Sequence, residues 1–101
     1  VRISEAVMRY IVALVQGTRE HPALALGASP RGSLALMRLS MVMARMDGRD
    51  FVLPDDVKAL VKPALAHRLI QSTESRIKRE SVEDILDEIM EKTVVVEEGG
   101  A

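Results

Sequence analysis

Arg31 is the residue whose type and place in the sequence could do chemistry most directly. It follows the run Gly27-Ala28-Ser29-Pro30, in which Ser29 is a predicted N-cap and Pro30 suits the first helical position. A helix N-terminus has free N–H groups and the positive end of the helix dipole, so it attracts anions. An arginine is disfavoured there unless an anion from elsewhere occupies the site, and its guanidinium suits bidentate contact with phosphate. From the residues alone, a phosphate contact and a surface salt bridge to the acidic half of the chain both stay open.

The other candidate catalytic groups are scattered. His21 lies in a predicted loop and His67 stands beside Arg68 on a predicted helix, and we expect both histidines to be solvated or structurally hydrogen-bonded. Asp55 and Asp56 are adjacent carboxylates at a predicted helix start, where capping is their simplest role. The sequence has no cysteine and no P-loop, GxGxxG, HExxH, GxSxG or EF-hand pattern. We therefore expect that the chain by itself is not an enzyme.

Length and composition predict one small helical domain. The chain has 101 residues, of which 48% are apolar and only 2% aromatic. This composition favours a core of aliphatic side chains on helices over a β-sandwich. No apolar run approaches the ~20 residues of a membrane span, nothing resembles a signal peptide, and the lack of cysteine fits a cytoplasmic location. Because helical spacing begins at the first residues, we expect the chain to be a piece of a longer protein.

Charge is divided unevenly along the chain. Residues 1–49 hold seven basic and three acidic side chains, a net charge of +4, whereas residues 50–101 hold seven basic and twelve acidic ones, a net charge of −5. The simplest interpretation is two solvated surfaces that attract each other within the fold. The overall charge of −1 excludes a strongly basic nucleic-acid domain as a description of the whole chain.

Apolar spacing and capping signals predict an all-α bundle of four to five helices. We expect helices over 4–16, ended by Gly17, over 30–46, from Pro54 to a break at Pro63, over 63–70, and over 81–92 behind a capping box at Ser81. Residues 18–29 and 71–80 are predicted connectors, the second partly extended. Residues 51–53 are predicted as a strand stub near Phe51, to which Val94-Val95-Val96 could pair. The folded domain is expected over 1–92, with a mobile tail over 93–101.

The predicted helix over 30–46 is expected to be the central and most buried one, because apolar residues cover most of its circumference. It holds four of the six methionines, which we interpret as core filling in preference to a plastic binding surface. Arg31, Arg38 and Arg45 are seven residues apart, so they share one narrow stripe.

Three blocks of sequence resemble the C-terminal lid subdomain of MoxR-type AAA+ ATPases, in order and in spacing. The resemblance covers about residues 3–92, and its blocks are Gly27-Ala28-Ser29-Pro30-Arg31-Gly32-Ser33, the run from Gly48 to Leu60, and Leu65-Ala66-His67-Arg68-Leu69. It implies a small helical bundle that packs on an ATPase core lying outside this chain. Two departures from the family pattern are Leu53, where Thr is more usual, and Gly32, where Ala is common. The glycine is expected to cost up to ~1 kcal/mol of helix propensity.

The resemblance also implies a function. Arg31 stands at the position of the sensor-two arginine, which reaches the γ-phosphate of ATP, and Ala28, Ser29, Pro30 and Arg31 would contact ATP with Mg held by the core. The fragment alone would neither hydrolyse ATP nor bind it stably. Implied partners are the core, neighbouring subunits of a ring, expected to be a hexamer, and von Willebrand factor A domain proteins, in chaperone-like assembly work; no membrane partner is implied.

Two alternatives remain. One is a histone-like DNA-binding module with Arg31, Arg38, Arg45 and Arg49 on phosphates, against which the net charge argues. The other is an interaction domain whose acidic helix over 81–92 docks on a basic partner. The sequence does not reveal the client protein or assign roles to His67 and Arg68.

Overall fold

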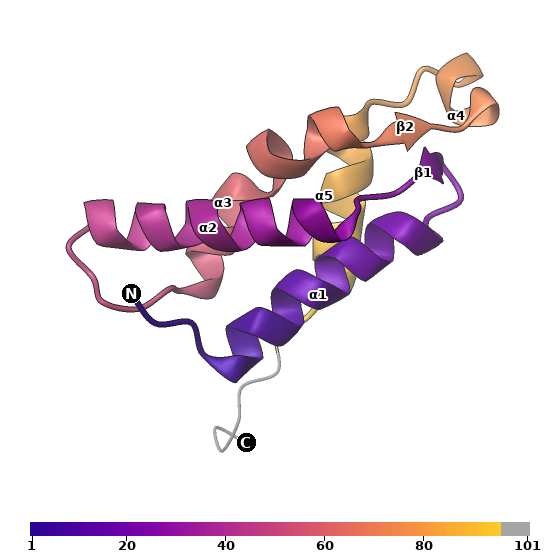
Figure 1. Cartoon of the computed structure of the whole chain (residues 1–101). Coiled ribbons are helices and arrows are strands. Elements are labelled where there is room, and N and C mark those ends of the chain that lie inside the picture. Colours follow the sequence, from indigo (N-terminus) through magenta and orange to yellow (C-terminus); the bar gives the residue numbers. More distant parts are fainter. Residues whose placement is uncertain (96–101) are drawn as a thin grey trace.

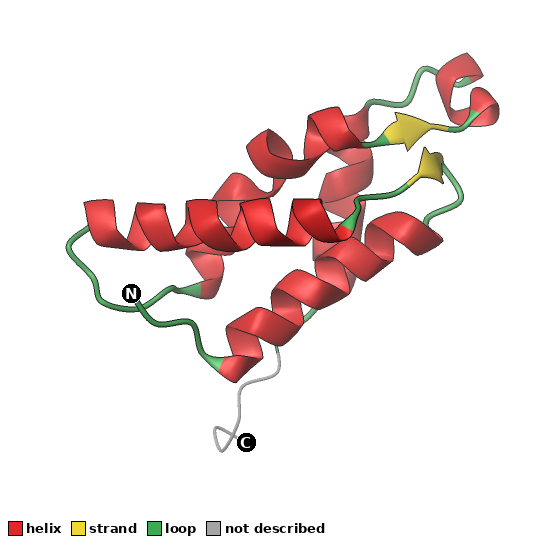
Figure 2. Cartoon of the chain, in the orientation of Figure 1, coloured by secondary structure: helices red, strands yellow, loops and turns green. Residues whose placement is uncertain are grey.

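The structure is a computed structural model, and it describes residues 1–95 as a bundle of helices with a two-stranded sheet at one end (Figures 1 and 2). This confirms the predicted helical fold class. The elements in chain order are α1 (Glu5–Glu20), β1 (Leu24–Leu26), α2 (Pro30–Met46), α3 (Pro54–Leu65), a 3-10 turn (Ala66–Arg68), β2 (Ile70–Gln71), α4 (Thr73–Ile77) and α5 (Val82–Lys92).

The core lies where α1, α2, α3 and α5 meet. Helix α2 packs against α1 and α3, and α5 packs against the same two helices from behind in the view of Figure 1. The largest side chains with less than 2% exposure are mostly aliphatic, as the composition predicts: Tyr10, Ile11, Leu14, Leu36, Val57, Val61, Leu65 and Leu86. Among the described residues, no helix is long and apolar enough to cross a membrane.

Helix α1 does not end at Gly17, as predicted, but continues to Glu20. A Cβ at Gly17 would lie 2.8 Å from Cγ2 of Ile89, so the missing side chain lets α5 approach α1. The glycine therefore serves helix packing here, and it does not terminate the helix.

Pro63 does not break its helix, and no separate helix covers 63–70. Helix α3 runs through Pro63 to Leu65, and Ala64 and Leu65 continue its buried face. A proline removes one hydrogen bond of the helix, and close to the C-terminus the burial of the next two side chains outweighs that loss. Beyond the 3-10 turn, Ile70 pairs with Leu26 in an antiparallel sheet that the sequence did not predict.

The expected strand stub near Phe51 pairs with a different segment from the one predicted. Phe51 forms an isolated parallel bridge with Arg2, and not with Val94 or Val95, the valines after α5 that the structure describes. Thr93 donates its backbone N–H to the carbonyl of Met90, and Val95 packs against the core. Val96 and the rest of the expected tail lie outside the described residues.

In the C-terminal third of the chain, the short helix α4 was not predicted, whereas α5 was. The predicted connector over 71–80 includes Gln71, the second residue of β2, and the short helix α4, whose N-cap Ser72 accepts a hydrogen bond from the backbone of Ser75. Helix α5 has the predicted range, and the predicted cap is present, because Ser81 Oγ accepts from the Asp84 N–H at 3.0 Å.

Helix α2 has the predicted bounds but is not the most buried helix. Its fully buried residues are Gly32, Leu36, Ser40 and Ala44, which follow one another at intervals of four and form a narrow stripe. Met46 is 82% exposed, which also contradicts core filling for this methionine. Because α1 and α3 cover only one side of α2, several of its apolar side chains face outward.

The end of α2 is fixed to the start of α3. Gly48 adopts a positive φ of 76°, and the Arg49 N–H donates to the Ala44 carbonyl at 2.9 Å, which closes the helix with a Schellman motif. The Arg49 guanidinium then makes two hydrogen bonds of 2.7 Å to the carboxylate of Asp56. Asp56 also accepts from the Leu53 N–H at 2.7 Å, so it caps α3 as the sequence predicts.

The ion pair between Arg49 and Asp56 makes the free energy of unfolding of the domain depend on pH. Its hydrogen bonds, together with that from the Leu53 N–H, hold the pKa of Asp56 below its ordinary value of 3.8, although burial opposes this. A carboxyl whose pKa is lowered by folding stabilises the protein above its ordinary pKa, and this contribution is lost as the pH falls through the lowered value.

We expect Asp56→Asn to lower the free energy of unfolding at pH 7 by about 1.5–3 kcal/mol, since a charge-assisted pair is lost. Urea unfolding from pH 7 downward should show the difference from wild type shrinking below pH 3.8. Asp55→Asn is the matched control, because Asp55 is exposed and makes no ion pair with the described residues. Equal losses in both variants would contradict a structural role for the pair.

Candidate functional site

The loop that leads into α2 is anchored on the last turn of α1. The Ala28 N–H donates to Thr18 Oγ1 at 2.9 Å, and this hydroxyl donates to the Val15 carbonyl at 2.6 Å. The Ala28 carbonyl accepts from Arg19 Nε at 3.0 Å. Thr18 is fully buried. Because Thr18 binds the N–H of Ala28 and Arg19 binds its carbonyl, both polar groups of the Ala28 backbone are held in place. The sequence predicts residues 18 and 19 as part of a connector, whereas both lie on α1, and this anchor is therefore not predicted from the sequence.

Two glycines of the first sequence block permit close approach. A Cβ at Gly27 would lie 2.7 Å from the backbone N and Cα of Arg19, so the loop crosses α1 in direct backbone contact. A Cβ at Gly32 would lie 3.1 Å from Cβ of Ala28 and 3.2 Å from Cδ2 of Leu65. The departure from the family pattern at Gly32 therefore fits the tight packing of α2 on the end of α3.

The N-terminus of α2 is open, unlike those of the other α-helices. Ser29 occupies the predicted N-cap position, but its side chain makes no capping hydrogen bond, and the first turn holds no acidic residue. Among residues 1–95, α1, α4 and α5 each begin with an N-cap serine whose hydroxyl accepts from the first turn: Ser4, Ser72 and Ser81. Helix α3 lacks such an N-cap bond, but its first turn holds Asp55 and Asp56, and Asp56 accepts from the Leu53 N–H. The Gly32 N–H donates to the Ser29 carbonyl at 2.8 Å, so what the positive end of the α2 dipole lacks among the described residues is a side-chain acceptor or an acidic group.

Arg31 projects from this open first turn. It is exposed, and it makes no hydrogen bond or ion pair with residues 1–95, so the salt bridge to the acidic half is not formed there. Ser29 and Pro30 are exposed beside it, whereas Ala28 is only 1% exposed. Of the four residues predicted to contact ATP, three are accessible and the fourth holds the loop.

Arg68 lies next to the same turn. Its Cδ is 3.7 Å from the place that a Cβ of Gly32 would take, and its Nε donates to the Ala64 carbonyl at 3.1 Å. The fold thus brings the first and third sequence blocks together and places a second arginine near Arg31. The sequence signal was the block from Leu65 to Leu69, which gave no position for Arg68.

The histidines carry no catalytic arrangement in the described part of the chain. His21 Nδ1 accepts the Ala23 N–H at 3.0 Å, and Nε2 lies 3.2 Å from a carboxylate oxygen of Glu88. This confirms His21 as a structurally hydrogen-bonded residue. His67 is exposed on the 3-10 turn.

The acidic helix α5 is partly neutralised within the fold. Hydrogen bonds hold the pKa of Glu88 below its ordinary range. The bond from Lys92 has the larger effect, and the bond from His21 the smaller one. The Nζ of Lys62 lies 2.9 Å from a carboxylate oxygen of Asp87. The predicted attraction between the two halves of the chain is present in part, through Arg2 with Asp50 and through Arg49 with Asp56.

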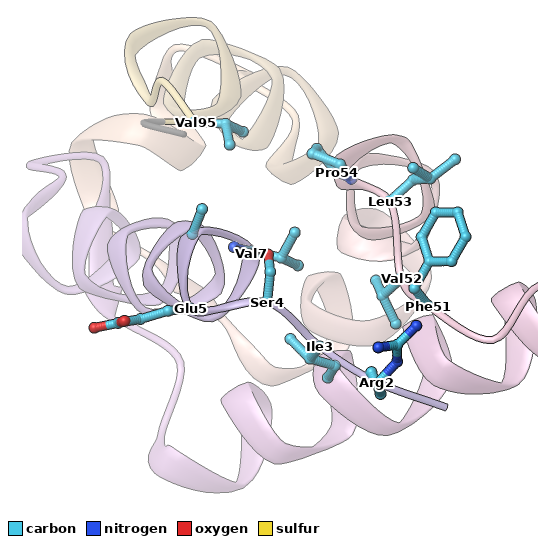
Figure 3. Close-up of a pocket in the computed structure, with 11 residues that line it drawn as sticks. Arg2, Ile3, Ser4, Glu5, Val7, Phe51, Val52, Leu53, Pro54 and Val95 are labelled. Atoms are coloured by element: carbon cyan, nitrogen blue, oxygen red, sulfur yellow. Dashed lines mark hydrogen bonds between the residues drawn. The ribbon is translucent and has the colours of Figure 1, made fainter. Parts of the chain in front are cut away.

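A surface groove of about 530 Å³ lies at the opposite end of α1 from this loop. Its walls come from the N-terminal segment, the start of α1, the run Phe51–Pro54 and Val95 (Figure 3). Among its polar residues, Ser4 is already used to cap α1. The groove is thus mainly apolar and separate from Arg31.

Fold and site together define a small helical module with an exposed arginine at a helix N-terminus that has no side-chain cap. Residues 16–89 match the family model described as the AAA lid domain, and the chain belongs to this family. The match includes both the loop before α2 and the Arg49–Asp56 pair.

Two of three similar proteins are named MoxR1 and MoxR, in agreement with the predicted resemblance to MoxR-type proteins. The chain is 42% identical over 90 residues to the uncharacterized protein YeaC of Bacillus subtilis, covering 89% of this chain and 28% of that protein. It is 30% identical over 98 residues to the chaperone MoxR1 of Mycobacterium tuberculosis, covering 88% and 26%. The protein MoxR of Paracoccus denitrificans is 33% identical over 92 residues, covering 78% and 27%.

A solved structure shares the fold. The crystal structure of a predicted ATPase from Cytophaga hutchinsonii superimposes with a TM-score of 0.91 at 33% identity, covering 96% of this chain and 32% of that protein. The chain thus spans less than a third of the length of the relatives that it matches.

We expect Gly27→Ala to destabilise the fold more than Gly48→Ala. At Gly48 an alanine would meet no atom within 4 Å and would suffer only the positive φ, a cost of about 1–2 kcal/mol. At Gly27 backbone atoms of two segments must separate, and the bonds of Ala28 to Thr18 and Arg19 must stretch. Urea unfolding monitored by circular dichroism compares the two variants, and a smaller loss for Gly27→Ala would contradict the tight crossing.

Proposed function

We propose that this chain is the lid of a MoxR-type AAA+ ATPase and that Arg31 is its sensor-two arginine. The observation that carries the proposal is an exposed arginine, without a partner among residues 1–95, on an uncapped helix N-terminus whose entering loop is fixed. Family membership supports the lid, and the residues at the start of α2 fit a phosphate group. The fit rests on a free guanidinium and on a first turn without carboxylates.

The chemistry follows from the placement of charge. Nucleotide with Mg would be held by the core, outside this chain, and would supply the phosphoryl group that is transferred. Arg31 would stabilise the negative charge that develops on that group. Because Ala28 ties the start of α2 to α1, a pull on Arg31 would be transmitted to the whole bundle. Loss of the phosphate contact after hydrolysis would then allow the lid to turn relative to the core.

The same proposal extends to the assembly. The lid would pack on its own core and contact neighbouring subunits of a ring, a hexamer, in the cytoplasm. The relative from Mycobacterium tuberculosis is named a chaperone, and we propose chaperone-like assembly or activation of partner proteins, with von Willebrand factor A domain proteins as partners.

The alternatives have weaker support from the structure. Arg49, one of the four arginines assigned to DNA, is bound to Asp56. Asp87 and Glu88 of the acidic helix pair with Lys62 and Lys92. Each alternative thus loses side chains that it requires to be free.

The test compares steady-state ATP hydrolysis of the full-length protein that carries this chain with that of its variants. We expect Arg31→Ala to lower kcat by about tenfold or more, and Arg31→Lys to recover little because a lysine lacks the planar fork. Arg76→Ala is the matched control, since Arg76 is exposed on α4 without an ion pair to the described residues. An unchanged kcat in Arg31→Ala, with the lid still folded, would contradict the proposal.

A further inference from the structure

The second half of α2 presents an apolar surface to the outside. Leu39, Val42 and Met46 are 40%, 53% and 82% exposed. Arg38 and Arg45 lie beside them, and both are exposed without a hydrogen bond or ion pair to residues 1–95. We call these five residues the distal face of α2.

The spacing of the distal face is that of a coiled-coil seam. Leu39, Val42 and Met46 follow at intervals of three and four, as the a and d positions of a heptad do. Arg38 and Arg45 each precede an a position, so they occupy g positions, where charged residues select a partner helix. Along a helix rising about 1.5 Å per residue, the seam from Leu39 to Met46 is about 10 Å long.

This surface is distinct from the nucleotide contact proposed for Arg31. Arg45 is fourteen residues further along α2, which corresponds to about 21 Å along the helix axis. The distal face begins about 10 Å beyond Arg31. A phosphate at the first turn therefore leaves the distal face unoccupied.

We infer that the distal face docks an acidic amphipathic helix of another protein. The three apolar side chains supply a seam for leucine or isoleucine at heptad spacing. The unpaired guanidinium groups of Arg38 and Arg45 supply the charge that glutamates flanking such a seam would neutralise. Burial of the exposed apolar atoms and pairing of both arginines would occur together on binding.

A second copy of this chain fits the distal face poorly. Two antiparallel α2 helices would bring g positions together and oppose Arg38 and Arg45 to each other. The acidic helix α5 of another copy offers charge, but the side that carries its acidic residues holds no apolar side chain: Glu83, Asp84, Asp87 and Glu91. Nucleic acid would neutralise the arginines but leave Leu39, Val42 and Met46 uncovered.

The test uses a fluorescein-labelled peptide of three heptads with leucine at a and d and glutamate at e and g. Anisotropy titration against the 101-residue chain should show saturable binding that weakens in about 1 M salt, where the Debye length is about 3 Å. Arg38→Glu with Arg45→Glu should weaken binding about tenfold or more. Val42→Ser should also weaken it, in low and in high salt alike.

The matched control is Arg76→Glu with Arg79→Glu, which changes the net charge equally in α4 and just after it. Helix α4 lies at the other end of the bundle from the C-terminal end of α2 (Figure 1). It should bind the peptide as wild type does. Circular dichroism checks that each variant is folded.

Four results would overturn the inference. These are equal binding of the peptide with lysine in place of glutamate, equal loss in the control variant, binding of a DNA duplex as tight as that of the acidic peptide, and peptide binding by the isolated chain but not by the full-length protein. The last would show that the rest of the polypeptide covers the distal face. None of them bears on the ATPase effect of Arg31→Ala.

Discussion

The buried hydroxyl of Thr18 is the interaction on which the geometry of the candidate site depends. It accepts a hydrogen bond from Ala28 and donates one to Val15, so it joins the last turn of α1 to the loop before α2. The contact is possible only because Gly27 leaves room for two backbones to touch. Since Arg31 follows three residues later, the direction in which its side chain leaves the bundle is set by a residue on another helix.

The other end of α2 is fixed by an independent device. A Schellman turn at Gly48 places Arg49 within hydrogen-bond distance of Asp56, whose carboxylate also caps α3. With both ends held by polar contacts and one side packed on α1 and α3, the helix does not need its remaining surface for stability. The outward residues of α2, with Arg31 at one end and Met46 at the other, are thus available for partners.

Local signals in the chain predicted several of the helix ends correctly. Pro30, Gly48 and Ser81 set the ends of α2 and the start of α5 correctly, because caps and turns act within a few residues. The same kind of signal was wrong at Gly17 and Pro63. There the close approach of α5 and the burial of the end of α3 outweigh the local preference, and both involve residues distant in sequence.

The sequence by itself determined that the domain is helical, where α2 and α5 lie, and that Arg31, Arg38 and Arg45 share a stripe, since composition, caps and the helix period are properties of the local chain. Only the tertiary structure decided which side of each helix is covered. It showed that α2 is half open, that Arg68 comes to lie near Arg31, and that Arg49 is committed to Asp56. These outcomes depend on contacts between segments far apart in the chain, and no local pattern of residue types encodes which neighbour a helix will meet.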